Sequence, residues 1–297
     1  MMMKSGFVSV VGRPNVGKST LVNAMVGQKV AITSRRPQTT RNTIRGVVTD
    51  PAADPPSWQM VLVDTPGLHR PRNELGDRLN RLVYGALADA DVIAFLLDAR
   101  RPIGPGDRRI AERLTSDPSK VVVLVNKIDG FSKEKIAMAL TEAARWDFGA
   151  YVPISALRGE NLEAVVAEIS ARLPEGPMYF PADAVSDQPD WFFAAEVIRE
   201  KFLARLRHEL PHSLLVTVED FEVRPDGLVA VAAKLVVESG SQRGIVIGRG
   251  GALLKEAGSL ARRELEAFFG AKVYLDLRVV VEKKWQRRSV LLDRFGF

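Results

Sequence analysis

The 297-residue chain contains no cysteine and only three histidines, His69, His208 and His212. Without cysteine it can form no disulfide, no thiolate-bound zinc site and no thiol-based catalytic centre. Three scattered histidines are too few for a histidine-rich metal cluster. The chain also lacks a long hydrophobic run, because stretches such as Val92–Leu97 and Val121–Val125 have only the length of a strand. These absences argue against a disulfide-stabilised protein, a cysteine- or histidine-rich metal protein and a protein with a transmembrane helix.

The N-terminal residues do not have the layout of a signal peptide. Phe7–Val11 leads directly into a glycine-containing loop, with no small-residue cleavage site between them. Together with the lack of a transmembrane segment, this predicts a soluble, cytoplasmic protein.

The net charge of +6 is unevenly distributed along the chain. Residues 181–238 contain 6 basic and 11 acidic side chains, whereas residues 239–297 contain 12 basic and 6 acidic ones. A modest positive excess on a solvated surface needs no function. A reversal of sign within one small region, however, favours an anionic partner for the final segment.

The first part of the chain alternates apolar, strand-like runs with segments of helical spacing. The runs that end at polar loops are Phe7–Val11, Val61–Asp64, Val92–Asp98, Val121–Asn126 and Tyr151–Ser155, and the helical segments include Ser19–Val26, Glu74–Ala88 and Asn161–Leu173. Such alternation predicts an α/β fold with a mostly parallel sheet and helices on both faces. Thr43–Thr49 and Ser57–Val63 are expected to form an antiparallel hairpin at its edge.

A different organisation begins after residue 173. Leu173–Asp190 contains four prolines and no periodicity, which predicts a linker over residues 174–190. Beyond the linker, the pattern indicates the order helix, strand, strand, helix, helix, strand. The sequence therefore predicts two domains, residues 1–173 and residues 191–297.

The stretch GRPNVGKST, residues 12–20, follows a predicted strand and opens a predicted helix. It fits the pattern G-x-x-x-x-G-K-[ST], in which backbone N–H groups at a helix N-terminus surround a phosphate. Lys18 is expected to contact the β- and γ-phosphates, and Ser19 to ligate Mg²⁺. The structural alternative is a glycine turn before a helix.

Three further motifs, each at the end of a predicted strand, argue against a simple glycine turn. In Asp64-Thr65-Pro66-Gly67, the carboxylate is placed to hold Mg²⁺ and the Gly67 N–H to sense a γ-phosphate. In Asn126-Lys127-Ile128-Asp129, the Asp129 carboxylate can accept hydrogen bonds from N1 and N2 of guanine but not from adenine. In Ser155-Ala156-Leu157, a backbone N–H can meet guanine O6.

These motifs predict a P-loop G domain that binds GTP and GDP with Mg²⁺. The predicted nucleotide-binding residues are Gly12, Arg13, Pro14, Asn15, Val16, Gly17, Lys18, Ser19, Thr20, Asp64, Thr65, Pro66, Gly67, Leu68, Asn126, Lys127, Asp129, Ser155, Ala156 and Leu157.

One catalytic position differs from that of many GTPases. A glutamine two residues after Pro66 commonly orients the attacking water, but here that residue is Leu68. Slow intrinsic hydrolysis is therefore expected. Backbone groups, a water network or a monovalent cation could substitute, and Asn15 matches the asparagine with which related potassium-activated GTPases ligate K⁺. The alternative is that Asn15 only satisfies local backbone groups.

The segments Gln28–Arg41 (QKVAITSRRPQTTR) and Leu173–Phe202 resemble the Era family of bacterial GTPases. The resemblance covers essentially the whole chain and implies a G domain followed by a type II KH domain. It places Thr39 and Thr40 in the first switch loop, with Thr40 as the ligand of Mg²⁺ and of the γ-phosphate. It further implies a monomer that binds the 3′ end of 16S ribosomal RNA, assists maturation of the 30S subunit and associates peripherally with the inner membrane.

The C-terminal region supports the KH expectation independently, because its predicted element order is that of a type II KH domain. A GxxG loop between two predicted helices, Gly248–Gly251, can approach a nucleic-acid backbone closely. The residues predicted to contact RNA are Ile245, Val246, Ile247, Gly248, Arg249, Gly250, Gly251 and Lys255. A glycine-rich helix connection is the structural alternative.

A competing function is that of an RNA-binding adaptor that binds GTP with negligible turnover. The presence of Lys18, Ser19, Thr40 and Asp64 favours hydrolysis instead.

Overall fold

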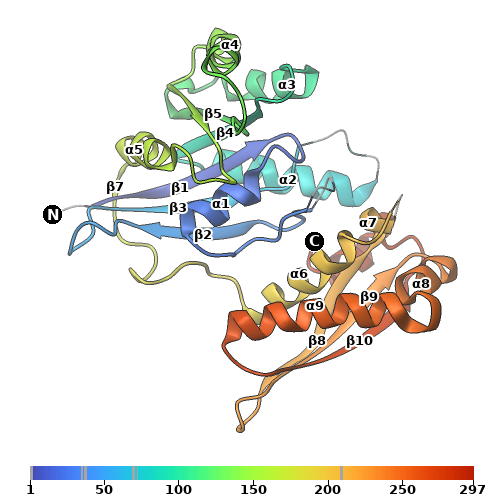
Figure 1. Ribbon diagram of the computed structural model, residues 1–297. Coiled ribbons are helices and arrows are strands. Elements are labelled where there is room, and N and C mark those ends of the chain that lie inside the picture. Colours follow the sequence, from blue (N-terminus) through green and yellow to red (C-terminus); the bar gives the residue numbers. More distant parts are fainter. Residues whose placement is uncertain (1–2, 35, 37–38, 69–70, 72, 208–209) are drawn as a thin grey trace. The chain divides into compact units, whose positions relative to one another are not determined.

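The computed structural model describes residues 3–34, 36, 39–68, 71, 73–207 and 210–297, so His69 and His208 lie outside the described residues. The chain forms two compact units (Figure 1). The first comprises Met1–Ala31, Thr40–Pro71 and Gly76–Asp187, and the second comprises Ile32–Thr39, Arg72–Leu75 and Gln188–Phe297. Each unit is described by itself below.

The first unit contains a sheet in which the strands have the order β2-β3-β1-β4-β5-β6. The strands are β1 (Met3–Gly12), β2 (Ile44–Thr49), β3 (Trp58–Asp64), β4 (Val92–Asp98), β5 (Val121–Asn126) and β6 (Ala150–Ile154). All neighbouring pairs along this path are parallel except β2 and β3, which form the antiparallel pair at the edge. The predicted hairpin is therefore confirmed.

Two layers of helices enclose this sheet (Figure 1). The helices are α1 (Lys18–Val26), α2 (Glu74–Ala88), α3 (Pro105–Leu114), α4 (Lys133–Ala143) and α5 (Leu162–Arg172), with 3₁₀ turns at Pro118–Lys120 and Ala144–Trp146. Alternate residues of the central strands face different layers: Leu96 packs in a cluster with residues of α1 and α5, whereas Phe95 packs with residues of α2 and α3. Burial on both faces explains why these strands are continuously apolar.

Most of the predicted linker packs on the first unit as an ordered strap. The short strand β7 (Glu175–Gly176) pairs antiparallel with the start of β1. The side chain of Gln59 accepts hydrogen bonds from the N–H groups of Tyr179 and Phe180 and donates one to the Phe180 carbonyl. The prolines prevent a regular strand or helix here, but the segment is still packed. The buried Gln59 side chain forms the hydrogen bonds with the backbone that a neighbouring strand would otherwise form.

The second unit has one helix-covered sheet, with strand order β10-β9-β8. Its elements are α6 (Asp190–Leu203), α7 (Leu210–Ser213), β8 (Leu215–Val223), β9 (Val229–Val237), α8 (Gly240–Ile247), a 3₁₀ turn Arg249–Gly251, α9 (Ala252–Phe269), β10 (Val273–Val281), a 3₁₀ turn Trp285–Arg287 and α10 (Ser289–Arg294). β9 is antiparallel to β8 and parallel to β10.

The core of this unit lies between the sheet and two helices. Ala257, Ala261 and Leu265 recur every fourth residue on α9 and are completely buried against residues of α6 and β9. The predicted order is confirmed, with the short helices α7 and α10 added to it. In the described part of the chain, no helix combines the length and the apolar character that crossing a membrane requires.

Candidate functional site

The phosphate loop turns from β1 into α1 in the left-handed backbone conformation at Gly17, where φ is 110°. A Cβ atom there would clash with the Asn126 side chain, so the position requires glycine. Beside it, the Lys18 Nζ donates hydrogen bonds of 3.3 Å to the carbonyls of Gly12 and Arg13. Burial lowers the Lys18 pKa to about 8, although the nearby Asp64 charge partly opposes this. A buried cation at a helix N-terminus suits a phosphate group.

Three oxygen donors come together next to the loop. The Ser19 hydroxyl donates to Asp64 Oδ2 over 2.6 Å, the Thr40 hydroxyl donates to the same oxygen over 3.1 Å, and the two hydroxyls lie 3.0 Å apart. The other carboxylate oxygen, Asp64 Oδ1, is buried with no hydrogen-bond partner among the described residues. Burial raises the pKa of Asp64, against the effects of Lys18, Ser19 and Thr40.

This donor set fits Mg²⁺, which prefers a few hard oxygen ligands and keeps several waters. A bound ion would give the unsatisfied Asp64 oxygen a partner, directly or through water, and would replace the mutual hydrogen bonds of the two hydroxyls. The residues predicted as metal ligands, Ser19, Thr40 and Asp64, are thus the ones that the structure brings together.

The base-recognition residues lie at the ends of β5 and β6. Asn126 links three segments, because its Nδ2 donates to the Val16 carbonyl over 2.8 Å and its Oδ1 accepts from the N–H of Ala156 over 3.0 Å. The Asp129 carboxylate accepts a hydrogen bond of 3.0 Å from the Ser155 hydroxyl, which holds it at the same edge of the sheet. The four predicted motifs are therefore assembled around the carboxyl ends of the strands.

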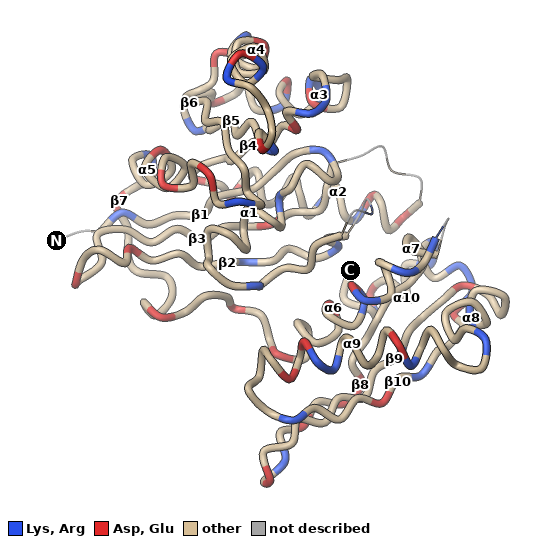
Figure 2. Tube along the Cα trace, viewed as in Figure 1, with Lys and Arg blue, Asp and Glu red and all other residues tan. Residues whose placement is uncertain are grey.

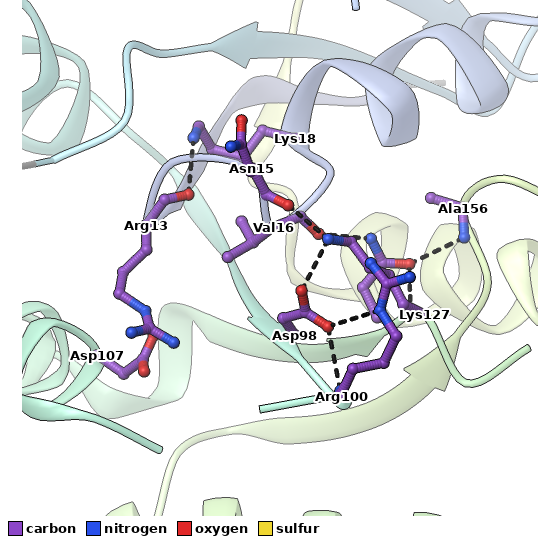
Figure 3. A network of polar contacts seen from close by, with 10 residues as sticks. Arg13, Asn15, Val16, Lys18, Asp98, Arg100, Asp107, Lys127 and Ala156 are labelled. Atoms are coloured by element: carbon purple, nitrogen blue, oxygen red, sulfur yellow. Dashed lines mark hydrogen bonds and ion pairs between the residues drawn. The ribbon is translucent and has the colours of Figure 1, made fainter. Parts of the chain in front are cut away.

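A carboxylate that the sequence analysis did not assign, Asp98, completes this network. Its Oδ2 accepts from Lys127 Nζ over 2.8 Å, and its Oδ1 accepts from the Arg100 side chain over 3.3 Å (Figure 3). The same Lys127 Nζ also donates to the Asn15 carbonyl. Burial raises the pKa of Asp98, but the Lys127 and Arg100 interactions outweigh it and hold that pKa below its usual value. The available signal was position: Asp98 ends a strand at the same sheet edge as Asp64.

Other predicted residues contribute differently from their assigned roles. The Thr65 hydroxyl donates to the Val10 carbonyl over 2.8 Å, so its side chain ties β3 to β1. Leu68 packs against the apolar cluster under α2 and α3, which is consistent with a side chain that orients no water. Leu157 is 79% exposed beside the base-recognition residues.

The GxxG loop of the second unit connects α8 and α9, as predicted. At Gly248, φ is 77°, and a Cβ atom would lie 2.8 Å from the Leu253 backbone nitrogen, so only glycine fits. Arg249 and Lys255 are exposed, and Ile245 is 54% exposed beside the loop. Val246 is completely buried, so its side chain packs in the core and only its backbone is left for the predicted RNA contact. Figure 2 shows basic and acidic residues intermixed along α9.

The second unit also holds a segment that precedes Thr40. Arg199 of α6 is almost completely buried, pairs with Glu196 over 2.6 Å and donates to the Thr39 carbonyl. Glu200 accepts from the Thr33 N–H over 2.9 Å. Nothing in the sequence pattern indicated this anchoring, because charged residues on a helix are normally solvated.

Comparisons with known proteins found relatives of both regions of the chain. A family model described as 50S ribosome-binding GTPase matches residues 7–127, and one described as KH domain matches residues 209–286. GTPase Era of Mycobacterium avium (strain 104) is 49% identical, and that of Mycobacterium tuberculosis (strain H37Rv) is 50% identical. The alignment covers 99% of this chain in both cases, and 99% and 98% of those proteins.

Two solved structures are similar over almost the whole length. One is Era in complex with MgGDPNP and nucleotides 1506–1542 of 16S ribosomal RNA, with a TM-score of 0.94, 36% sequence identity and 99% coverage of both chains. The other is an Aquifex aeolicus Era variant bound to GDP·AlF₄⁻, with a TM-score of 0.93 and the same identity and coverage. With the nucleotide motifs, the KH unit and the full-length similarity together, the chain belongs to the GTPase Era family.

Proposed function

We propose that this GTPase binds the single-stranded 3′ region of 16S ribosomal RNA through its KH unit and assists maturation of the 30S subunit. The observation that carries the proposal is the loop Gly248–Gly251, which lies between two helices and is flanked by exposed basic and apolar side chains. A related Era protein with 36% identity has been solved with nucleotides 1506–1542 of that RNA, which supports the choice of target.

The chemistry of the loop suits a nucleic-acid backbone. Gly250 and Gly251 both have positive φ and no atom within 4 Å of a built Cβ, so the backbone can approach a phosphate without a side chain intervening. Arg249 supplies charge, and Ile245 offers an apolar surface to an unstacked base. Affinity should therefore fall steeply as salt rises, since each phosphate contact releases counterions.

GTP is proposed to control this binding through the first unit. The hydroxyls of Ser19 and Thr40 and the Asp64 carboxylate form the site that fits Mg²⁺. In GTPases, contacts of Mg²⁺ and the γ-phosphate order the switch segments and are lost on hydrolysis. The switch here contains Thr40 and Gly67, and the GTP form is expected to favour RNA.

Hydrolysis itself depends on positioning and charge neutralisation more than on covalent chemistry. Lys18 supplies positive charge to the transferring phosphate, and Mg²⁺, when bound, neutralises charge that develops on the phosphate oxygens. K⁺ held by Asn15 is proposed as a further source of charge, because Leu68 provides no polar side chain.

Two further expectations concern properties that neither the nucleotide site nor the RNA-binding loop addresses. Peripheral association with the inner face of the cell membrane and a monomeric state both remain predictions. Flotation with anionic vesicles and light scattering of the purified protein would measure them.

The experiment that tests the RNA proposal compares the full-length protein with its Arg249→Asp variant in binding a fluorescent RNA of the 16S 3′ sequence. A scrambled RNA of equal length is the control for non-specific binding, and GTP affinity is the control for the fold. Unchanged RNA affinity in the variant would contradict the proposed clamp. A protein that binds GTP and RNA but shows no turnover would instead support the adaptor function.

A further inference from the structure

The side chain of Arg13 leaves the phosphate loop and ends at the start of α3 (Figure 3). Its Nε lies 2.9 Å from Oδ1 of Asp107, whose side chain is 2% exposed, against 27% for that of Arg13. An ion pair with one partner buried is screened less by water and salt than a surface pair. The loop is therefore tied to a helix that contributes none of the predicted nucleotide-binding residues.

The start of α3 is shaped for this arginine. A Cβ atom on Gly106 would lie 2.7 Å from Arg13 Cδ, and one on Gly104 would lie 3.2 Å from Arg13 Nη1. The segment Gly104–Asp107 thus forms a cradle in which the absent side chains of two glycines leave room for the arginine. Asp107 fixes the cradle, because its second oxygen accepts from the Gly104 N–H over 2.9 Å.

The backbone of the same arginine belongs to the phosphate site. The Arg13 carbonyl is one of the two that accept a hydrogen bond from Lys18 Nζ. A shift of Arg13 would therefore displace an acceptor that holds the lysine expected to contact the phosphates. Side chain and backbone of one residue connect α3 to the phosphate loop.

We propose that Arg13 and Asp107 are positioning residues for guanine nucleotides, which hold the phosphate loop in its binding conformation through the α3 cradle. A loop that is already held loses less conformational freedom when a ligand binds, so anchoring raises affinity without a new contact to the ligand. The β-phosphate is common to GDP and GTP. Loss of the anchor should therefore weaken both nucleotides by a similar factor.

The sharpest test is Gly106→Ala, because it displaces the Arg13 side chain without removing either member of the ion pair. Alanine is a better helix former than glycine, which offsets part of the cost of moving Arg13 away from Asp107, so without bound nucleotide the variant should melt within a few degrees of the parent. The added methyl group must push Arg13 aside, and the Kd of a fluorescent GDP analogue should rise about tenfold, which corresponds to about 1.4 kcal/mol. The matched control is Gly85→Ala on α2, where a built Cβ meets no atom within 4 Å.

A second variant, Asp107→Asn, removes the charge and keeps an oxygen that can accept from the Gly104 N–H. It should raise the Kd of GDP and of a nonhydrolysable GTP analogue equally, with kcat at saturating GTP changed less than KM. In the double variant with Arg13→Ala, the two effects should not add, because both remove the same pair. Nucleotide affinities of Gly106→Ala and Asp107→Asn within twofold of the parent would overturn the proposal. So would a lower melting temperature of Asp107→Asn with unchanged affinity, which is the result expected of a helix cap alone.

Discussion

The hydroxyl of Ser19, in the first turn of α1, lies 2.6 Å from a carboxylate oxygen of Asp64, the last residue of β3. Thr40, from the segment between α1 and β2, joins this pair. Ser19 and Thr40 are 45 and 24 positions away from Asp64 in the sequence, yet the side-chain oxygens of the three residues form one small cluster. We expect this cluster to be where the protein responds to Mg²⁺ and the γ-phosphate of GTP.

Thr39 and Thr40 are adjacent in the sequence and provide a matched pair of variants for testing the role of this cluster. Thr40→Ala removes a member of the oxygen cluster, and we expect GTP hydrolysis to slow by about a hundredfold, the range observed when one preorganised transition-state contact is removed. GDP affinity should change little. Thr39→Ala is the control, because the Thr39 hydroxyl donates to the Arg36 carbonyl instead. Equal losses of hydrolysis in both variants would contradict the assignment.

Base selection should depend on Asp129. In Asp129→Asn, the carboxylate that accepts from guanine N1 and N2 is lost, and GTP affinity should fall by about ten- to a hundredfold, as for charged hydrogen bonds. Xanthosine triphosphate should bind better to the variant than to the parent, since its O2 can accept from the new amide. Competition binding with both nucleotides measures the change. A variant that retains the parent's preference for GTP would show that another group reads the base.

Position along the chain predicted that the four motifs would come together, because each motif is next to the end of a strand and the carboxyl ends of parallel strands meet at one edge of the sheet. Asp98 ends a strand as well, but a single aspartate without a motif does not identify its partner. The strap at residues 174–187 and the burial of Arg199 could not be predicted, because both depend on contacts with residues more than 100 positions away. Local pattern carries no information about such contacts.

Asp98 should support nucleotide binding by holding Lys127. We expect Asp98→Asn to raise the Kd of GDP and GTP by about three- to tenfold, the effect of weakening a partly buried charged hydrogen bond. The pKa of Asp98 is lowered in the folded protein, so its contribution is fully present above the ordinary aspartate range. It is lost only as the pH falls through the lowered value. The ratio of variant to parent Kd should therefore stay constant between pH 6 and pH 8. A ratio that changes over this range would contradict the role assigned to the Asp98 carboxylate.

Potassium should accelerate hydrolysis if Asn15 ligates a monovalent cation. Turnover at saturating GTP should be faster in KCl than in NaCl of the same ionic strength, and Asn15→Ala should remove the difference. The rate in NaCl serves as the reference for damage to the loop itself. Identical rates of the parent protein in both salts would exclude Asn15 from this role.

If GTP controls RNA binding by the KH unit, the RNA affinity of the protein must depend on the bound nucleotide. The measurement is the Kd of the full-length protein for the 3′-terminal 16S segment, in GDP and in a nonhydrolysable GTP analogue, at one fixed salt concentration. We expect tighter RNA binding with the analogue, by about five- to a hundredfold as is usual for coupled sites. RNA binding should be lost in both nucleotide states when Arg249 and Gly250 are changed to Asp. Equal RNA affinity of the parent protein in the two nucleotide states would show that GTP does not control RNA binding.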